Sequence, residues 1–217
     1  MTMRPSARTI RRILPSVLIS LAGCFSLSRN SPPVQHYVLG GALSPANPPV
    51  ARDPARVTVG VRRLQLASYL ETPFIVVRRG AQRITFSELH RWGEDLGGGI
   101  NRAVAGYLAV RAPFARLDVA PWPVGTHHDY LIQLHVSSFE GSAPEDSSAQ
   151  QGEAHVQAAW QIIRQADGEV VGQGTTDFRK GGWSVGDYAG LVALLDAGLA
   201  ALATDLATGL GNVGGES

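Results

Sequence analysis

The last quarter of the chain constrains the fold most, because it repeats apolar side chains at the spacing of one helix face. Seven large residues recur there in steps of three and four: Tyr188, Leu191, Leu195, Leu199, Leu202, Leu206 and Leu210. Asp196 and Asp205 fall elsewhere on the circumference. We therefore predict an amphipathic helix from about Val185 to Leu210 that lies on a sheet and does not span a membrane.

A second helical pattern is expected from Glu94 to Val110. The apolar residues at helical spacing are Trp92, Leu96, Ile100, Val104, Tyr107 and Leu108. Three consecutive glycines, Gly97 to Gly99, interrupt the pattern, and each glycine inside a helix costs about 1 kcal/mol relative to alanine. We expect the helix either to bend at these glycines or to pack closely against the sheet.

Much of the remaining sequence is typical of strands with one wet face. The strand-like segments are residues 56–61, the two arms of a hairpin around Gly80, residues 130–137, residues 153–162 and residues 169–178. Asp167 and Gly168 are a strong turn signal before the last segment, and residues 140–152 are expected to form a long polar loop. The sequence therefore predicts an α+β fold, a mainly antiparallel sheet with two amphipathic helices packed on one face.

The N-terminus has the order of an export signal: a basic start, a short apolar run and then small residues. Four arginines and no acidic residue precede or begin the apolar stretch of residues 13–22. A membrane-spanning helix needs roughly 20 apolar residues. Because the chain turns polar at Ser26, this run is too short to span.

The residues that end the apolar run look like a bacterial lipobox, the site after which a lipoprotein signal peptidase cuts: Leu21, Ala22, Gly23 and Cys24. Cleavage between Gly23 and Cys24 would leave the only cysteine for lipid attachment, and two or more acyl chains anchor a protein stably. The alternative is an ordinary cleavage site with an incidental cysteine. We predict a signal peptide at residues 1–23, a lipidated cysteine and tether at 24–35, and a single periplasmic domain at 36–217.

The charge of the processed chain argues against nucleic acid as a partner. Residues 1–23 hold four of the 19 basic and none of the 18 acidic side chains, which leaves 15 against 18 and a net charge near −3. A nucleic-acid-binding domain needs a clustered basic face. With Cys24 lipidated, no cysteine remains for a disulfide.

Several stretches are distinctive when taken in order with the lipobox and the leucine-rich last helix: "YVLG", "VGVRRLQLASYLETPFIVVR", "RWGEDLGGGINRAVAGYLA", "DYLIQLHVSSFEG" and "AAWQII". Together they resemble the ABC-type transport auxiliary lipoprotein family, the PqiC-like proteins, over nearly the whole processed chain. The resemblance implies a periplasmic domain tethered to the outer membrane. It also implies work with mammalian-cell-entry (MCE) proteins, which are thought to move lipids between the two membranes.

No catalytic centre is visible in the sequence. It contains no G-x-S-x-G elbow, no G-x-x-x-x-G-K-[ST] phosphate loop and no dinucleotide fingerprint. His127, His128 and Asp129 are adjacent, but neighbouring side chains of an extended segment point to opposite faces, so we expect a solvated loop or strand start there. His135 and His155 are expected to be outward polar positions. We predict no metal, no cofactor and no enzymatic activity.

Five residues are candidates for a partner-binding surface: Tyr69, Leu70, Pro73, Trp122 and Trp183. The two tryptophans lie in expected loops, where exposed aromatic residues are enriched at interfaces, and the other three belong to the "SYLETPF" turn. Local packing, or shaping of the sheet edge by the turn, is the alternative for these residues. Trp92 and Trp160 are expected in the core instead.

Three classes of function remain. The favoured one is an outer-membrane-anchored accessory lipoprotein that binds an MCE-domain protein and its ABC transport system. The second is a structural or assembly lipoprotein of the envelope, and the third is a hydrolase. Phe25 stands where an aspartate would resemble an inner-membrane retention signal, which favours the outer membrane by analogy. Exposed sheet edges associate readily, so a homo-oligomer, such as a ring stacked on the MCE partner, is a weaker extension.

Overall fold

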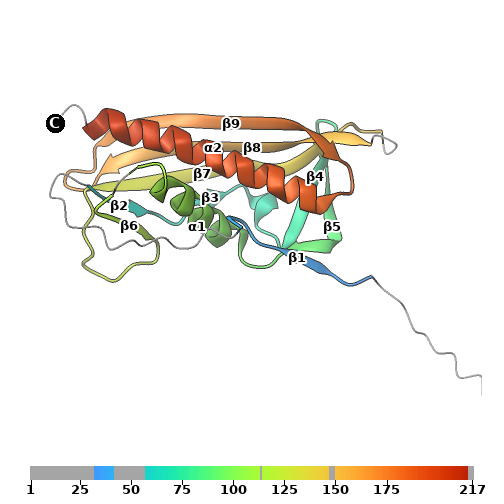
Figure 1. Ribbon diagram of the computed structural model, residues 1–217, viewed down its shortest axis with the longest axis horizontal. Coiled ribbons are helices and arrows are strands. Elements are labelled where there is room, and N and C mark those ends of the chain that lie inside the picture. Colours follow the sequence, from blue (N-terminus) through green and yellow to red (C-terminus); the bar gives the residue numbers. More distant parts are fainter. Residues whose placement is uncertain (1–31, 42–56, 113, 147–149, 215–217) are drawn as a thin grey trace, which may run out of the picture. The chain divides into compact units, whose positions relative to one another are not determined.

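The computed structural model describes residues 32–41, 57–112, 114–146 and 150–214 of the chain. The fold is that of the compact unit Pro33–Ser217. Its strands belong to one nine-stranded sheet, and two α-helices and one 3-10 turn complete it (Figure 1). The elements in chain order are β1 (Gln35–Tyr37), β2 (Thr58–Val61), β3 (Gln65–Leu66), η1 (Ser68–Leu70), β4 (Phe74–Arg79), β5 (Arg83–Trp92), α1 (Leu96–Ala109), β6 (Arg116–Val119), β7 (Tyr130–Ala143), β8 (Gln151–Arg164), β9 (Val170–Ser184) and α2 (Tyr188–Gly214).

Strand β7 is the centre of the sheet. On one side it pairs antiparallel with β8, which pairs antiparallel with β9. On its other side it pairs in parallel with the shorter strands β2, β3 and β4 at successive positions along its length. The long pairs are antiparallel, as predicted, and the sheet also contains short parallel pairs that the sequence did not predict.

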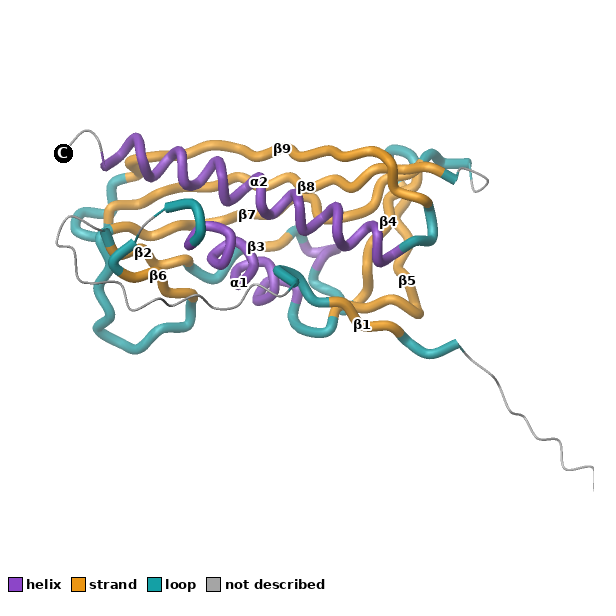
Figure 2. Tube along the Cα trace, viewed as in Figure 1, coloured by secondary structure: helices purple, strands orange, loops and turns teal. Residues whose placement is uncertain are grey.

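Both α-helices lie on the same face of the sheet (Figures 1 and 2), and the α+β prediction is confirmed. Helix α1 begins after Asp95, whose side chain accepts a hydrogen bond from the Gly98 N–H at 2.8 Å. Helix α2 begins after Asp187, which accepts from the Gly190 N–H at 2.9 Å. Aspartates favour these positions because they satisfy amide groups that have no partner inside the helix.

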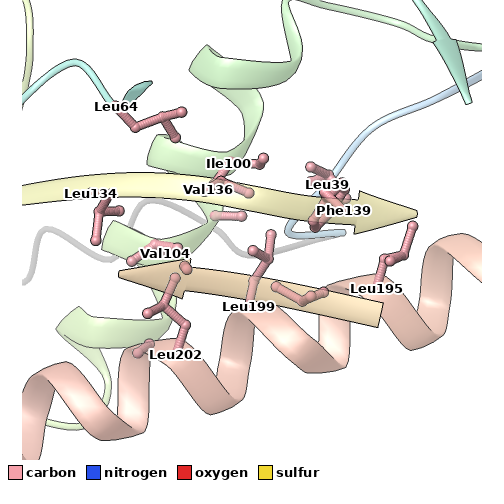
Figure 3. Close-up of a cluster of buried hydrophobic side chains, with 14 of the residues drawn as sticks. Leu39, Leu64, Ile100, Val104, Leu134, Val136, Phe139, Leu195, Leu199 and Leu202 are labelled. Carbon is pink, nitrogen blue, oxygen red and sulfur yellow. The ribbon is translucent and has the colours of Figure 1, made fainter. Parts of the chain in front are cut away.

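The leucine stripe of α2 is the centre of the core. Leu191, Leu195, Leu199, Leu202 and Leu206 are 0% exposed. The close-up in Figure 3 shows three α2 leucines with residues of β7 and α1: Leu195, Leu199, Leu202, Leu134, Val136, Phe139, Ile100 and Val104. By length and composition Tyr188–Val213 would suffice to cross a membrane. Its apolar stripe instead covers the sheet.

The three glycines of α1 do not serve close packing, so that part of the expectation is wrong. A Cβ at Gly97 or Gly98 would come no closer than 3.4 Å to another atom, the Asp95 carboxylate, and one at Gly99 would lie 3.2 Å from the Glu94 carboxylate and not against the sheet. Close approach occurs in α2 instead, where a Cβ at Gly198 would lie 2.6 Å from a Val156 methyl group. Helix α1 runs through its glycines because Asp95 caps it and its remaining apolar face is buried.

The long loop expected at residues 140–152 is also wrong in its extent. Strand β7 continues to Ala143 and β8 begins at Gln151. The small residues Gly141 and Ala143 are buried on the core face, while the side chain of Glu140, between Phe139 and Gly141, points to the opposite face. The strand pattern therefore continues, but the core-facing positions hold small residues instead of large apolar ones, so the sequence does not show it.

Candidate functional site

The turn between β3 and β4 is held by backbone hydrogen bonds. The Ala67 N–H donates to the Val136 carbonyl of β7 at 3.0 Å, and the Trp92 N–H of β5 donates to the Pro73 carbonyl at 2.8 Å. Leu70 is 0% exposed, so its assignment to a partner surface is wrong: it anchors the turn in the core. Tyr69 is half-buried and Pro73 is exposed. These two remain available as surface residues.

Behind Tyr69 lies a buried ion pair between β4 and β7. The Arg78 guanidinium donates to both oxygens of Glu140, and the Glu140 residue is 0% exposed. Arg78 also lies 5.6 Å from the centre of the Tyr69 ring, while the Tyr69 hydroxyl donates to the Ser137 carbonyl at 3.1 Å. Burial, with the Glu140 carboxylate second, raises the pKa of Tyr69. The hydrogen bond to Glu140 raises the pKa of Arg78.

Replacing Arg78 with methionine is expected to destabilise the fold, because it leaves the Glu140 carboxylate buried without its cation. Loss of one partner of a buried pair typically costs about 3–5 kcal/mol. We expect about 2–3 kcal/mol here, since the Arg78 side chain is 28% exposed. A thermal melt followed by circular dichroism should fall by roughly 4–12 °C.

The exposed pair Arg83 and Glu145 is the matched control. Its atoms are 3.7 Å apart and the side chains are 57% and 76% exposed, so Arg83→Met is expected to change stability by less than about 1 kcal/mol. Equal shifts for Arg78→Met and Arg83→Met would contradict the assignment. The double variant Arg78→Met, Glu140→Met should recover much of the loss, because neither charge is then buried alone.

An apolar groove lies beside the turn on strands β4 and β5. It encloses about 610 Å³ and is lined by Ser68, Tyr69, Thr72, Phe74, Thr85, Phe86 and Glu88. We call it the Phe groove. Phe86 is 45% exposed, its ring centre is 6.4 Å from that of Phe74, and the Arg91 guanidinium lies 4.9 Å from the Phe74 ring centre. Exposed aromatic rings beside a cation suit an apolar or aromatic side chain of a partner.

A larger cleft of about 1100 Å³ separates the turn from the start of α1. Its lining includes Leu70, Pro73, Trp92, Leu96, Gly97 and Pro121. Charges of both signs also line it, among them Arg63, Glu71 and Asp95. Pro73 of the turn lines this cleft, whereas Tyr69 lines the Phe groove, so the "SYLETPF" segment contributes to two concave surfaces.

Trp122 is half-buried and packs on a buried histidine. Its ring centre is 4.8 Å from that of His128 in an edge-on contact, and the His128 Nε2 lies 2.7 Å from the Asp118 carboxylate. The segment precedes the start of β7 at Tyr130, as expected, but the His128 side chain is 0% exposed, so the expectation that it is solvated is wrong. His127 is exposed.

The other histidines do not converge either. His135 lies opposite Ala159, and His155 lies opposite Glu140. His155 is 7% exposed and its ring lies 3.0 Å from the Asp177 carboxylate, so the expectation that it is solvated is wrong. Within the described ranges, no group of three or more His, Cys, Asp or Glu residues is arranged to hold a metal ion.

Trp183 is a core residue, so its assignment to a partner surface is wrong. It is 1% exposed, and its indole N–H donates to the Asp187 carbonyl at 2.9 Å. Its ring occupies space that Gly141 and Gly152 leave free, since a Cβ at either glycine would come within 2.8 Å of it. Trp92 is 5% exposed, which confirms its expected place in the core. Trp160 is partly buried and packs against the same core.

The predicted lipidation and cleavage residues, Gly23 and Cys24, lie outside the described residues. The described chain enters the domain at β1, which pairs in parallel with β5. Leu39 is 2% exposed, and the Gly40 N–H donates to Asp196 of α2 at 2.8 Å. The segment that follows the predicted tether is therefore fastened to both the sheet and a helix.

Sequence reasoning missed the Phe groove and the Arg78–Glu140 pair. The "FIVVRRGAQRITF" hairpin was predicted, and it carries Phe74 and Phe86 at its two ends. Antiparallel pairing of a hairpin brings its ends together, so this signal was present. No sequence signal indicated the ion pair, because Glu140 fell in the predicted loop of residues 140–152.

Comparisons with known proteins give one family and a shared fold. The model of a family described as ABC-type transport auxiliary lipoprotein component matches residues 37–207. No curated protein gives a significant match.

Among solved structures, protein XCC0632 from Xanthomonas campestris is 18% identical, with a TM-score of 0.60 over 74% of this chain and 86% of that chain. A crystal structure of an uncharacterized protein is 18% identical, with a TM-score of 0.53 over 71% of this chain and 91% of that chain. At these identities the likeness shows the fold alone.

Proposed function

Because the chain belongs to the family of ABC-type transport auxiliary lipoprotein components, we propose that it is the outer-membrane-anchored accessory subunit of an MCE and ABC-type lipid transport system. It acts from the periplasmic face by binding partner proteins. The observation that carries the proposal is the family match over residues 37–207, which spans most of the described domain.

The anchor is assigned to Cys24, with cleavage after Gly23. Residues 25–35 then provide a tether that, fully extended, reaches roughly 35 Å. The domain side of this tether is held at Leu39 and Gly40. The start of the domain is therefore fixed to α2 and to the sheet. The tether allows the domain to bind partners at a distance from its membrane.

The Phe groove is the surface we assign to the MCE-domain partner. Buried aromatic and apolar anchors dominate protein interfaces, and this groove offers two phenylalanines with Tyr69 at its rim. The family is an auxiliary component of transport and not a known enzyme family.

Removing the Phe86 ring is expected to weaken binding of the MCE partner about tenfold, the effect of losing about 1.4 kcal/mol at an interface hot spot. The Phe86→Ala protein, purified as the full chain in mild detergent, would be titrated with the periplasmic part of the MCE protein encoded by the same organism. Val110→Ala is the control, because Val110 is 66% exposed and does not line the groove. It should bind like the unaltered protein.

The second candidate is a structural or assembly lipoprotein of the envelope. It is favoured if the unaltered protein shows no association with the MCE partner at tens of micromolar. Hydrolysis of an ester or peptide by the same sample, lost on changing one serine or histidine, would instead favour the enzyme.

A further inference from the structure

Strand β9 is a long free edge of the sheet. It runs over 15 residues, Val170–Ser184, and in the described part of the chain it pairs with β8 alone. Figure 1 shows it along one side of the sheet with α2 lying across its face. Unpaired backbone groups on such an edge are a template for another strand, and natural proteins usually shorten, bend or charge their edges.

The middle of β9 is regular enough to accept a second strand. Its pairing with β8 is irregular only near its ends, at Glu153 opposite Gly181 and at Ile163 opposite Val170. Between these points the strand pairs without a shift. This stretch holds the charged residues Asp177, Arg179 and Lys180.

Among pairings of β9 with a second copy of itself whose axis lies within residues 177–180, these charges favour one. In an antiparallel pair of identical strands one residue lies on the two-fold axis, and residues equally far from it face each other. An axis at Asp177, Arg179 or Lys180 places like charges directly opposite, which destabilises a sheet. An axis at Phe178 places Asp177 opposite Arg179 of the other copy, twice. The two residues already lie 3.4 Å apart within each chain, so this register joins two pairs of opposite charge.

Side chains on the helix-facing side fit the same register. Phe178 is half-buried there and would meet its own copy at the axis. Lys180 would lie opposite Thr176 of the other copy, whose hydroxyl donates to the Asp205 carboxylate of α2. Lys180 is the only lysine in the chain, and within the described residues it forms no ion pair of its own.

Helix α2 presents a surface that tolerates such a neighbour. Its exposed residues are mostly small and uncharged, among them Ala193, Ala197, Thr208 and Gly211. Because α2 contacts β8 and β9, joining two β9 edges would bring two α2 helices side by side on one face. Small side chains allow helix axes to approach to about 8–10 Å.

We propose that the protein forms a two-fold dimer through antiparallel pairing of β9 with β9 of a second copy, with Phe178 on the axis. The result is one continuous sheet with all helices on the same face. The dimer is argued from the fold and not from the transport function. A result that contradicts one of these two proposals therefore leaves the other unaffected.

The first test uses the unaltered full chain in its membrane. A carbodiimide joins an amine to a carboxylate in direct contact, and the proposed register places Lys180 beside Asp205 of the other copy. Within one chain, Lys180 is four residues, about 14 Å, from Thr176 along the strand. We expect a band of doubled mass that contains a Lys180–Asp205 link, and none with Lys180→Arg, which keeps the charge but removes the reactive amine.

The second test places a cysteine on the axis. Cα atoms of directly opposite residues are about 4.5–5.5 Å apart, within the range of a disulfide. Full-length Phe178→Cys should therefore form a disulfide dimer on mild oxidation. Thr175→Cys should not, because its two copies would be about 20 Å apart. The unaltered chain, with Cys24 alone, sets the background.

Each result decides the proposal. A Lys180–Asp205 link together with a Phe178→Cys dimer supports it. A dimer from Thr175→Cys but not from Phe178→Cys overturns the register. A monomer in both tests overturns the dimer, and Lys180 then guards the edge against association, as edge lysines do in other sheets.

Discussion

Changing Cys24 to alanine is expected to abolish lipid attachment completely. The processing enzyme of a lipoprotein cuts before a lipid-modified cysteine, so the Cys24→Ala chain should accumulate as a precursor that keeps residues 1–23. The effect is all or none, because Cys24 is the only cysteine in the chain. Growth with a radioactive fatty acid should label the unaltered protein and leave the variant unlabelled.

The matched control is Ser26→Ala, a neighbouring change that leaves the cysteine in place. It should be labelled and processed normally. A Cys24→Ala protein that still carries label would contradict the anchor. Membrane fractionation of the unaltered protein tests the proposed location separately: we expect it with outer-membrane markers, and recovery with inner-membrane markers would contradict that assignment.

The parts of the fold with a strong local period could be predicted from the sequence. All seven predicted positions of the α2 stripe face the core: five are 0% exposed, Leu210 is 8% exposed and Tyr188 is partly buried. The turn at Gly80 was predicted because a glycine separates two strand-like runs, and the structure shows a left-handed φ of +63° there, which glycine favours. Period and turn chemistry are local properties, so a single sequence contains them.

The parallel pairs could not be predicted in the same way. Strand β2 pairs with β7 across about 70 residues, with Val59 opposite Tyr130. No turn joins two parallel strands, so neither the partner nor the register leaves a local signal. These pairs nevertheless position the "SYLETPF" turn, because β3 and β4 both lie against β7.

The burial of single residues at strand ends also could not be predicted correctly from the sequence. Trp183 was a candidate for a partner surface because it follows "RKGG" in an expected loop, with local packing as the alternative. It lies at an irregularity of the β8–β9 pairing, opposite Gly152, where the strand turns its ring toward the core. The candidate partner surface therefore loses the buried residues Leu70 and Trp183 and gains Phe86, which the sequence placed in a strand without showing its exposure.

Changing Leu199 to aspartate is expected to destabilise the domain by about 3–5 kcal/mol or more, because it removes a buried leucine and adds a charge without a partner. Leu199 is 0% exposed and lies between α2 and the sheet (Figure 3). Domains of this kind have only about 5–15 kcal/mol of stability, so a large fraction of the protein should unfold or be degraded. Leu202→Asp should behave in the same way, since Leu202 is also 0% exposed.

Ala197→Asp is the control for the charge itself. Ala197 is exposed on the same helix, two residues from Leu199, so the substitution adds the same group with the same helix propensity but leaves it in water. We expect a change in stability within about 1 kcal/mol, which includes the lower helix propensity of aspartate. Thermal melts of the three variants compare them directly. If Leu199→Asp melts like Ala197→Asp, then α2 does not cover the sheet through this face, and both the core and the dimer register built on β9 would have to be revised.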